Sequence, residues 1–305
     1  MSDERVESLS FFGIGDGKDV FADMVKVMAQ FNEKKREISD SVAAIEDEQE
    51  KADGLISKTV NELTTALLMR KSVKAKKYEY IEKLRAKKAS YDEEIHALDE
   101  KLRELKLETF GTEETPKLYF GRYPQKENGD SEPIEWDVMR VKGSGALLLS
   151  TYVIEHMRYA EELDNTPWHD CLIRKWLNGK FYTSCFSDEE RSMIRLTEIA
   201  NPGNEVYKTP ESSNTRDRIF IPSIKDVRRF YNYDEERKAY ATEFAKSKGV
   251  YADEDTGCSY WWLRSNGGNM YNAAAVNFKG YVFEYGFYVN SDGYGIRPAL
   301  WVDLR

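Results

Sequence analysis

The sequence predicts an α+β protein in which an α-helical coiled coil precedes a mixed domain. All six tryptophans and all eight prolines lie after residue 110, whereas the chain before it is rich in Lys, Glu, Ala and Leu. The later part mixes short strand-like and helical patterns, without the regular strand–helix repeat of a doubly wound sheet. We therefore expect a helical oligomerisation region over residues 1–110 and a separate domain over residues 117–305.

The helical region carries two heptad seams. Apolar residues recur at alternating three- and four-residue steps, which is typical of a coiled coil rather than of a broad core face. The earlier seam consists of Val20, Met24, Val27, Phe31, Ile38 and Ile45, and the later one of Ile81, Leu84, Tyr91, Ile95, Leu98, Leu102 and Leu105. Gly54 and the block Leu63, Leu67 and Leu68 interrupt the phase between them. A lone helix would leave its apolar stripe in water, so we expect two or three long helices that form a hairpin or assemble across subunits.

The charge balance argues against nucleic acid as the partner. The chain has 45 basic and 54 acidic side chains, a net charge of −9, which disfavours a general polyanion binder. A basic cluster comprises Arg70, Lys71, Lys74, Lys76 and Lys77. Acidic residues follow it on the same helical stretch, and interleaved charge of this kind is typical of a solvated helix face.

Short elements follow the expected helix stop at Phe110-Gly111. Strand-like runs span 118–125, 135–141 and 146–154. Helical runs span 168–178, 187–196 and 223–231, and the second opens with SDEE, a good N-cap followed by acidic residues. Strand character returns from residue 272 to 302.

The usual catalytic and metal-binding motifs are missing. There are three histidines and three widely spaced cysteines, with no HExxH, HxH or CxxC spacing. There is also no GxSxG, no GxxxxGK[ST] and no GxGxxG opening a helix. We expect no enzyme, no metal and no cofactor. Without a signal sequence or a long apolar run, a location in the cytoplasm or in a phage particle is expected, with no membrane contact.

The last fifty residues form an unusual aromatic window. From Tyr260 to Tyr294 there are 11 aromatic residues in 35 positions, but only two basic residues. Between Tyr281 and Phe287 the rings occupy odd positions, so on a strand they would share one face. A core strand would show the same alternation. However, the window is also rich in Asn, Ser, Gly and Asp, a mixture typical of recognition surfaces.

Several motifs in this half resemble an uncharacterised bacterial domain family. They include WWLRS (261–265), NAAAV (272–276) and GIRPALWV (295–302). Further matches are FGRYPQ (120–125), IEWDV (134–138), LLLS (147–150), IRKWLNGKFY (173–182) and CFSDEE (185–190). The resemblance covers residues 117–305 and leaves the coiled coil unexplained.

This family resembles the C-type-lectin-like fold, which variable proteins of diversity-generating retroelements and formylglycine-generating enzymes also use. In the variable proteins a fixed frame displays a hypermutated patch, and the window 269–294 is similar in position and composition. Met270, Lys279 and Glu284 do not fit the codon scheme of such a patch. The calcium-dependent sugar motifs of true C-type lectins and the cysteine pair of the formylglycine-generating enzymes have no counterpart.

The resemblance implies a binding site for a protein or another macromolecule on a C-type-lectin-like scaffold, multiplied by oligomerisation through the helices. Trp261, Trp262, Arg297 and the final strand would form the frame. The residues expected to face the ligand are Tyr271, Asn272, Asn277, Phe278, Tyr281, Phe283, Tyr285, Phe287, Tyr288, Asn290, Asp292 and Tyr294. Two alternatives stay open: a structural protein that acts through its coiled coil, and an enzyme similar to the formylglycine-generating ones.

Overall fold

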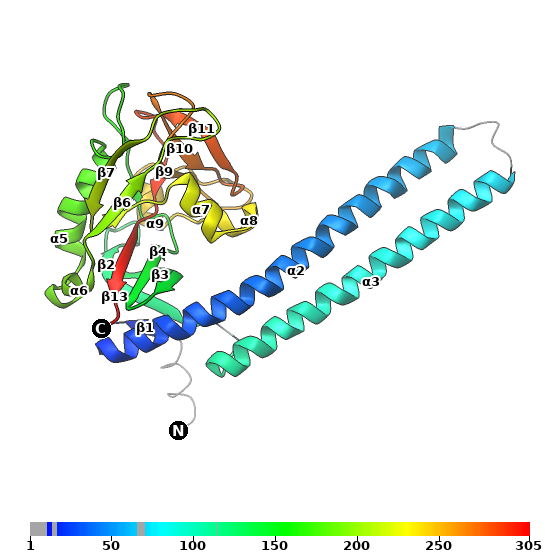
Figure 1. Cartoon of the computed structure of the whole chain (residues 1–305), viewed down its shortest axis with the longest axis horizontal. Coiled ribbons are helices and arrows are strands. Elements are labelled where there is room, and N and C mark those ends of the chain that lie inside the picture. Colours follow the sequence, from blue (N-terminus) through cyan, green and yellow to red (C-terminus); the bar gives the residue numbers. More distant parts are fainter. Residues whose placement is uncertain (1–10, 14–16, 66–70, 114) are drawn as a thin grey trace. The chain divides into compact units, whose positions relative to one another are not determined.

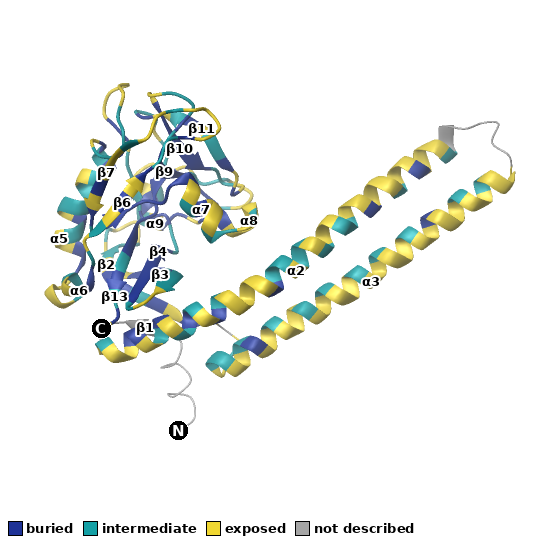
Figure 2. Ribbon diagram, viewed as in Figure 1, coloured by how far each residue is buried: buried dark blue, intermediate teal, exposed yellow. Residues whose placement is uncertain are grey.

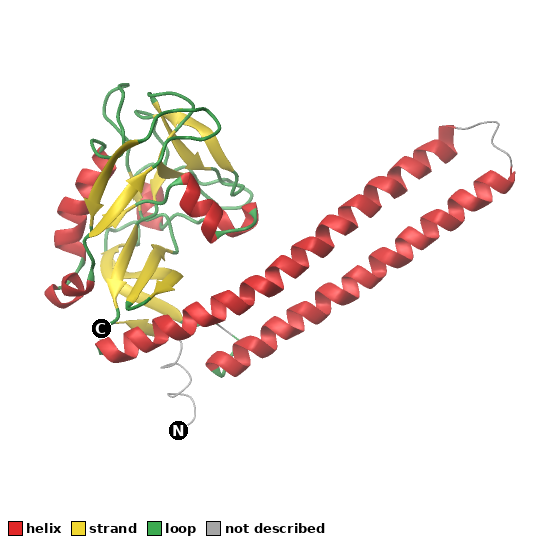
Figure 3. Cartoon of the chain, in the orientation of Figure 1, coloured by secondary structure: helices red, strands yellow, loops and turns green. Residues whose placement is uncertain are grey.

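The computed structural model describes residues 11–13, 17–65, 71–113 and 115–305 (Figure 1). These residues form two compact units, one made of Gln30–Thr115 and the other of Met1–Ala29 together with Pro116–Arg305. The fold is α+β, with two long helices followed by a β-rich part (Figure 3).

The first turns of the long helix α2 (Lys18–Thr65) belong to the β-rich unit, which differs from the expected division at residue 110. Phe21 and Val25 are completely buried, and the ring of Phe21 lies 5.5 Å from that of Phe120. Burial of such large apolar side chains stabilises a fold by about 1.5–3 kcal/mol each. The heptad pattern did not distinguish these residues, because their partner is a strand almost one hundred residues later in the sequence.

The helical unit is an antiparallel hairpin of α2 and α3 (Lys71–Phe110), one of the two arrangements that the seams predicted. Phe31 and Phe110 stack near one end, with 4.9 Å between ring centroids. Further along, Gln49 donates a hydrogen bond to Asp92 over 2.7 Å. Ion pairs join the same two helices at Lys88–Asp53, 2.5 Å, and at Lys77–Glu62.

The later seam faces inward but is only partly covered. Ile81 and Leu105 are buried, while Leu84, Tyr91, Ile95, Leu98 and Leu102 are half-buried (Figure 2). Helix α2 continues through Gly54, so this glycine does not break it. Leu63 of the same phase break is half-buried in α2, whereas Leu67 and Leu68, and Arg70 of the basic cluster, lie outside the described residues.

Helix α3 ends at Phe110, where the sequence predicted a stop. Gly111 has a φ of +73° and donates its N–H to the carbonyl of Leu107 over 2.9 Å. This left-handed conformation is the usual glycine C-cap of a helix.

The β-rich unit contains two larger sheets and a hairpin. The six-stranded sheet has the order β1-β2-β3-β4-β13-β8. Its strands are β1 (Phe11–Gly13), β2 (Lys117–Pro124), β3 (Ser131–Lys142), β4 (Gly145–Ser150), β8 (Ile219–Phe220) and β13 (Ala299–Asp303). The last strand β13 lies between β4 and β8, so the end of the chain returns to the sheet formed by the first strands of this unit.

The second sheet has five strands in the order β11-β10-β9-β12-β5. They are β5 (Glu155–His156), β9 (Trp261–Asn266), β10 (Asn272–Val276), β11 (Val282–Tyr288) and β12 (Gly295–Ile296). A separate hairpin pairs β6 (Thr197–Asn201) with β7 (Ser212–Asp217).

Short helices connect these strands. They are α4 (Leu172–Trp176), the π-helical turn η2 (Leu177–Phe181), α5 (Tyr182–Cys185), α6 (Asp188–Met193), α7 (Ile224–Phe230), α8 (Asp234–Arg237) and α9 (Glu243–Ser247). Helix α6 begins with the predicted cap, because the Ser187 side chain accepts from the N–H of Glu190 and Glu190 accepts from that of Ser187. Ser223 and Asp226 form the same box at α7. None of the described helices is long and apolar enough to span a bilayer.

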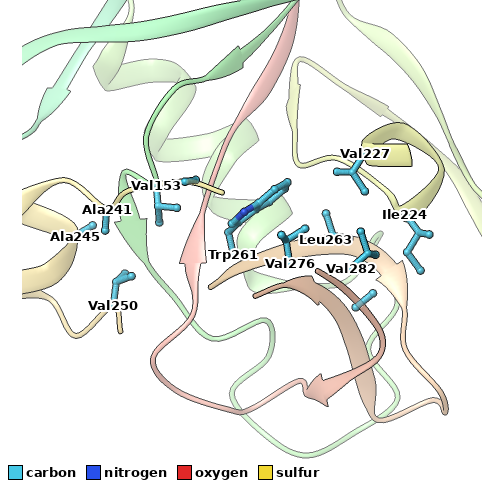
Figure 4. Packing of buried hydrophobic residues seen from close by; sticks show 12 residues of the cluster. Val153, Ile224, Val227, Ala241, Ala245, Val250, Trp261, Leu263, Val276 and Val282 are labelled. Carbon is cyan, nitrogen blue, oxygen red and sulfur yellow. The ribbon is translucent and has the colours of Figure 1, made fainter. Parts of the chain in front are cut away.

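The inner face of the five-stranded sheet packs into a buried core (Figure 4). Trp261 and Leu263 of β9 are completely buried, and Val276 and Val282 lie beside them. Figure 4 shows helix α7 covering one side of this cluster. Because side chains alternate along a strand, the residues of β9, β10 and β11 that lie between these core residues point to the outer face of the sheet.

Candidate functional site

The outer face of the five-stranded sheet carries the aromatic window. The pairing register of strands β9, β10 and β11 shows which side chains lie on this face. Ala275 pairs with Trp262 on one side and Phe283 on the other, whereas the next row pairs Val276 with Trp261 and Val282. Neighbouring residues in a strand point to opposite faces, so the row of Ala275, Trp262 and Phe283 lies opposite the core row.

A layer of stacked rings covers this outer face. Phe283 and Phe287 lie 4.8 Å apart, Phe287 and Tyr294 4.6 Å, and Tyr294 and Trp262 4.4 Å, measured between ring centroids. Tyr260 contacts the same layer edge-on, at 5.8 Å from Phe287. Such contacts add about 0.5–1.5 kcal/mol per pair beyond the burial of the rings. The layer is therefore a rigid base rather than a set of mobile side chains.

Trp262 anchors this base. It is completely buried, and its indole N–H donates to the carbonyl of Met157 over 3.0 Å. Arg297, also expected in the frame, is 3% exposed and bonds the carbonyl of Ser150 and the carboxylate of Asp137. Its guanidinium lies 5.3 Å from the centre of the Trp261 ring.

Four tyrosines of the window reach into solvent. Tyr281 is 55% exposed and Tyr288 57%, while Tyr271 and Tyr285 are exposed at 41% and 45%. Phe278, Phe283, Phe287, Asn290 and Tyr294 are half-buried, and Asp292 is exposed. We call Tyr271, Tyr281 and Tyr285 together with the half-buried rings Phe278, Phe283, Phe287 and Tyr294 the aromatic platform. Tyr288 is not part of it, because it follows Phe287 in β11 and pairs with Asn272, so it points to the other face.

A bulge in β11 shapes the platform. Between the pairs Ala273–Phe287 and Ala275–Phe283, β11 takes four residue steps where β10 takes two. The two extra residues preserve the alternation, so Phe283 and Phe287 share a face, as the odd-position pattern predicted. Gly286 makes the bulge feasible, because its φ is +72° and a Cβ atom there would lie 2.1 Å from the Ala273 carbonyl oxygen.

Asn272 does not face a ligand, contrary to the prediction for this residue. It is 4% exposed, and its amide donates to the carbonyl of Tyr285 over 3.2 Å. Asn277 is half-buried, and its side-chain oxygen accepts from the N–H groups of Lys279 and Tyr281. Short polar side chains often stabilise bulges and turns in this way, and composition alone cannot separate that role from recognition.

Two tyrosines outside the predicted set extend the platform. The ring of Tyr207 lies 5.4 Å from that of Tyr285. Tyr251 is 46% exposed and lies 5.6 Å from Tyr260 and 6.3 Å from Phe278. Both come from loops distant in the sequence. The signals of exposed loops there were neighbouring acidic residues and, beside Tyr207, Pro202, Gly203 and Pro210.

An open pocket of about 680 Å³ lies at one edge of the platform. Its lining residues are His156, Lys248, Gly249, Tyr251, Tyr260, Asp292, Gly293 and Tyr294. The Nε2 atom of His156 lies 2.7 Å from the Asp292 carboxylate and accepts the Gly293 N–H at 3.1 Å. A hydrogen bond from Arg158 holds the pKa of Asp292 below its ordinary value.

No alcohol or thiol side chain lines the pocket, although its histidine, lysine, aspartate and tyrosine side chains carry groups that can react. None of its lining residues is a serine, threonine or cysteine. Burial raises the pKa of the Cys171 thiol to about 12 and that of the Cys185 thiol to about 11. Thiols with such pKa values stay protonated at neutral pH and are poor nucleophiles. Among the residues that the structure describes, no three His, Cys, Asp or Glu side chains gather in a way that could hold a metal ion.

The sequence comparisons place the chain in a family without assigning an activity. Residues 143–304 match the family described as "Domain of unknown function (DUF6273)". This segment includes the whole five-stranded sheet and the aromatic platform. No curated protein and no solved structure matches the chain. Because the match spans more than half of its residues, the chain belongs to the DUF6273 family.

Proposed function

We propose that this protein binds a macromolecular ligand, most simply a protein, through the aromatic platform. The observation that carries the proposal is the make-up of the outer face: it combines solvent-exposed tyrosines, of which Tyr285 lies 6.4 Å from Phe283, with a layer of stacked rings that ends on the buried Trp262. Rigid aromatic side chains give a large contact area for little loss of conformational entropy. Tyrosine and tryptophan are also over-represented among residues that dominate binding energy.

The fold that we propose for the β-rich unit is C-type-lectin-like, in the manner of the variable proteins of diversity-generating retroelements. The ordered sequence motifs support this proposal. Residues of these motifs, including Trp261, Arg264 and Arg297, lie in the buried frame. The exposed platform tyrosines lie between the motifs, where a variable protein would place its changing positions.

The variable-protein proposal predicts where sequence variation is tolerated. Substitutions should be tolerated at Tyr271, Tyr281 and Tyr288, because their side chains are exposed. Substitutions at Gly280 and Gly286 should not be tolerated. A Cβ atom added at Gly280 would lie 1.6 Å from the Asp234 carbonyl oxygen, and one added at Gly286 would lie 2.1 Å from the Ala273 carbonyl oxygen. A reverse transcriptase gene next to this one, with a near-copy of the coding region for residues 269–294, is the expected genomic arrangement. A neighbourhood without both would contradict the variable-protein proposal and leave ligand binding as a separate proposal.

Ligand binding can be tested without knowing the natural ligand. A random peptide library is selected on the immobilised full chain, and the selected peptides are measured against variants. The double substitution Tyr281→Ala and Tyr285→Ala is expected to weaken their binding at least about tenfold, since central tyrosines often contribute more than 1 kcal/mol each.

A matched control uses Tyr78→Ala and Tyr80→Ala in α3. These tyrosines are 59% and 43% exposed, close to the values of the platform pair. We expect this control to bind like the unchanged chain. An unchanged melting temperature and molar mass of both variants confirms that only the surface differs. Equal losses in the two variants, or none in the platform variant, would contradict the proposal.

We further propose that the helical unit assembles copies of the chain, so that several platforms act together. The half-buried seam supports this, because a second hairpin would cover apolar surface that one hairpin leaves open. Assembly would raise the apparent affinity through effective concentration if the platforms face one ligand surface. Light scattering on the full chain should give a molar mass above the 35.4 kDa of one subunit. A mass of one subunit would contradict assembly.

A further inference from the structure

Three loops border the aromatic platform, and all three are acidic. Residues 157–166, 203–211 and 251–256 contain eight acidic residues and two basic ones. The acidic residues are Glu161, Glu162, Asp164, Glu205, Glu211, Asp253, Glu254 and Asp255. Seven of them are exposed and Asp253 is half-buried. Figure 2 shows exposed loops around β10 and β11.

Backbone and ring contacts fix each loop beside the platform. The N–H of Ala160 donates to the carbonyl of Val289 over 2.8 Å, next to Tyr288. The second loop contacts Tyr285 through the ring of Tyr207, and the Asn204 amide donates to the Glu284 carbonyl over 2.9 Å. For the third loop, the N–H of Tyr251 donates to the Gly293 carbonyl over 2.9 Å. The carboxylates therefore surround the exposed tyrosines on several sides.

Most of these carboxylates have no positive partner within the protein. Glu161, Glu162, Glu254 and Asp255 form no side-chain hydrogen bond or ion pair with any residue in the described ranges. None of these four side chains has the stabilising contacts that acidic residues form with a helix N-terminus or with a nearby lysine or arginine. An unpaired group of them around an apolar surface produces a negative potential over that surface instead.

Arg158, Arg228 and Lys279 near the platform are already engaged, whereas Lys208 of the second loop forms no side-chain hydrogen bond or ion pair with any described residue. Arg158 bonds the Asp292 carboxylate over 3.0 Å, and Arg228 pairs with Glu284. The ammonium of Lys279 lies 5.7 Å from the centre of the Phe278 ring. These side chains reduce the negative potential only locally, so the border remains acidic as a whole.

From this arrangement we infer that the partner of the platform is a positively charged protein surface, rich in lysine and arginine. The inference rests on the proposed function and names the partner that this site prefers. Cationic side chains are attracted to tyrosine faces and to a carboxylate border at the same time. Nucleic acid, which is anionic, would be repelled by the same border.

The test compares two pools of displayed peptides of equal length and equal aromatic content, one rich in Lys and Arg and the other in Asp and Glu. Both are measured against the full chain, and a single-stranded oligonucleotide serves as a third probe. We expect the basic pool to bind at least about tenfold more tightly than the acidic pool. Because the border is exposed, this preference should weaken as salt is added.

Substitutions that neutralise carboxylates show whether the border causes the preference for the basic pool. The triple substitution Glu162→Gln, Glu254→Gln and Asp255→Asn removes three unpaired border charges and is expected to reduce binding of the basic pool about tenfold. The control Glu46→Gln, Glu50→Gln and Glu104→Gln makes the same change in net charge on exposed positions of the hairpin. It should leave binding unchanged, which separates the border from the overall charge of the chain.

The remaining outcomes distinguish this inference from the proposed function. Equal binding of both pools, lost in the Tyr281→Ala and Tyr285→Ala variant, would overturn the inference and keep the platform as a binding site. Equal losses in the two charge-removed variants, or preferred binding of the oligonucleotide, would also overturn the inference. If neither pool binds even at low salt, both the inference and the proposed function are wrong.

Discussion

Replacing Gly286 with alanine is expected to destabilise the β-rich unit by about 3 kcal/mol or more. The left-handed φ of +72° costs a non-glycine residue about 1–2 kcal/mol. In addition, the new Cβ atom would lie 2.1 Å and 2.5 Å from the carbonyl oxygen and carbon of Ala273. These are backbone atoms of the paired strand β10, so relief requires the bulge to open, and overpacking of this kind costs about 1–3 kcal/mol more.

Urea unfolding followed by tryptophan fluorescence measures this loss directly. All six tryptophans lie in the β-rich unit, so unfolding of the hairpin does not contribute to the signal. Gly129→Ala is the matched control, since Gly129 has a φ of +82° but open space around the position of its Cβ atom. Only the conformational cost of about 1–2 kcal/mol is expected there. Similar losses in both variants would show that the contact with Ala273 does not require a glycine.

The second large effect is expected from Arg264→Met. The guanidinium of Arg264 donates to the carbonyl of Ile221 over 2.8 Å and to that of Ala200 over 3.3 Å, and it lies 2.5 Å from the Asp226 carboxylate. Methionine fills a similar volume but donates to neither carbonyl, and it leaves the Asp226 carboxylate without its positive charge although the hydrogen bonds from Ser223 remain. Removing one partner of a buried ion pair costs about 3–5 kcal/mol. We expect the lower end, because the Asp226 side chain is 28% exposed.

The pH dependence of this loss identifies the ion pair as its cause. Burial alone would raise the pKa of Asp226, but the charge of Arg264 and hydrogen bonds from Ser223 outweigh it and hold the pKa below its ordinary value. A carboxyl group with a lowered folded-state pKa adds stability above its unfolded pKa and loses it as pH falls through the folded pKa. The difference between the unchanged chain and the variant should therefore be largest above about pH 5 and shrink below about pH 4.

Arg305→Met serves as the control for this experiment. Arg305 also pairs with a carboxylate, that of Asp303 at 2.9 Å, but its side chain is 75% exposed. Exposed pairs contribute about 0–1 kcal/mol. A loss at Arg264 as small as the one at Arg305 would mean that water replaces the guanidinium.

Local signals in the sequence predicted local structure well. The serines before α6 and α7 are followed three residues later by an acidic residue, and both form capping boxes. The helix stop before Gly111 and the inward seam of α3 also agree with the prediction. In each case the partners lie within a few residues or recur at a fixed period, so the sequence contains the whole interaction.

Non-local contacts limited the prediction of the site. The amide of Asn272 bonds a carbonyl in the bulge of β11, a contact that composition cannot reveal. Tyr207 and Tyr251 join the platform from loops far away in the sequence. The same limit applies to the start of α2, where the predicted seam included Val20, which is 45% exposed, and left out Phe21 and Val25, which are buried in the β-rich unit.

Strand β10 pairs with a neighbour on each side, so the number of its residues is constrained more strictly than the identity of most of its side chains. Ala275 stands between Trp262 and Phe283 on one face, and Val276 between Trp261 and Val282 on the other. Inserting or deleting a single residue here would exchange the two faces. Indole and phenyl rings would then enter the interior while valines met water. In the evolution of this strand we therefore expect substitutions to be accepted far more readily than changes in length.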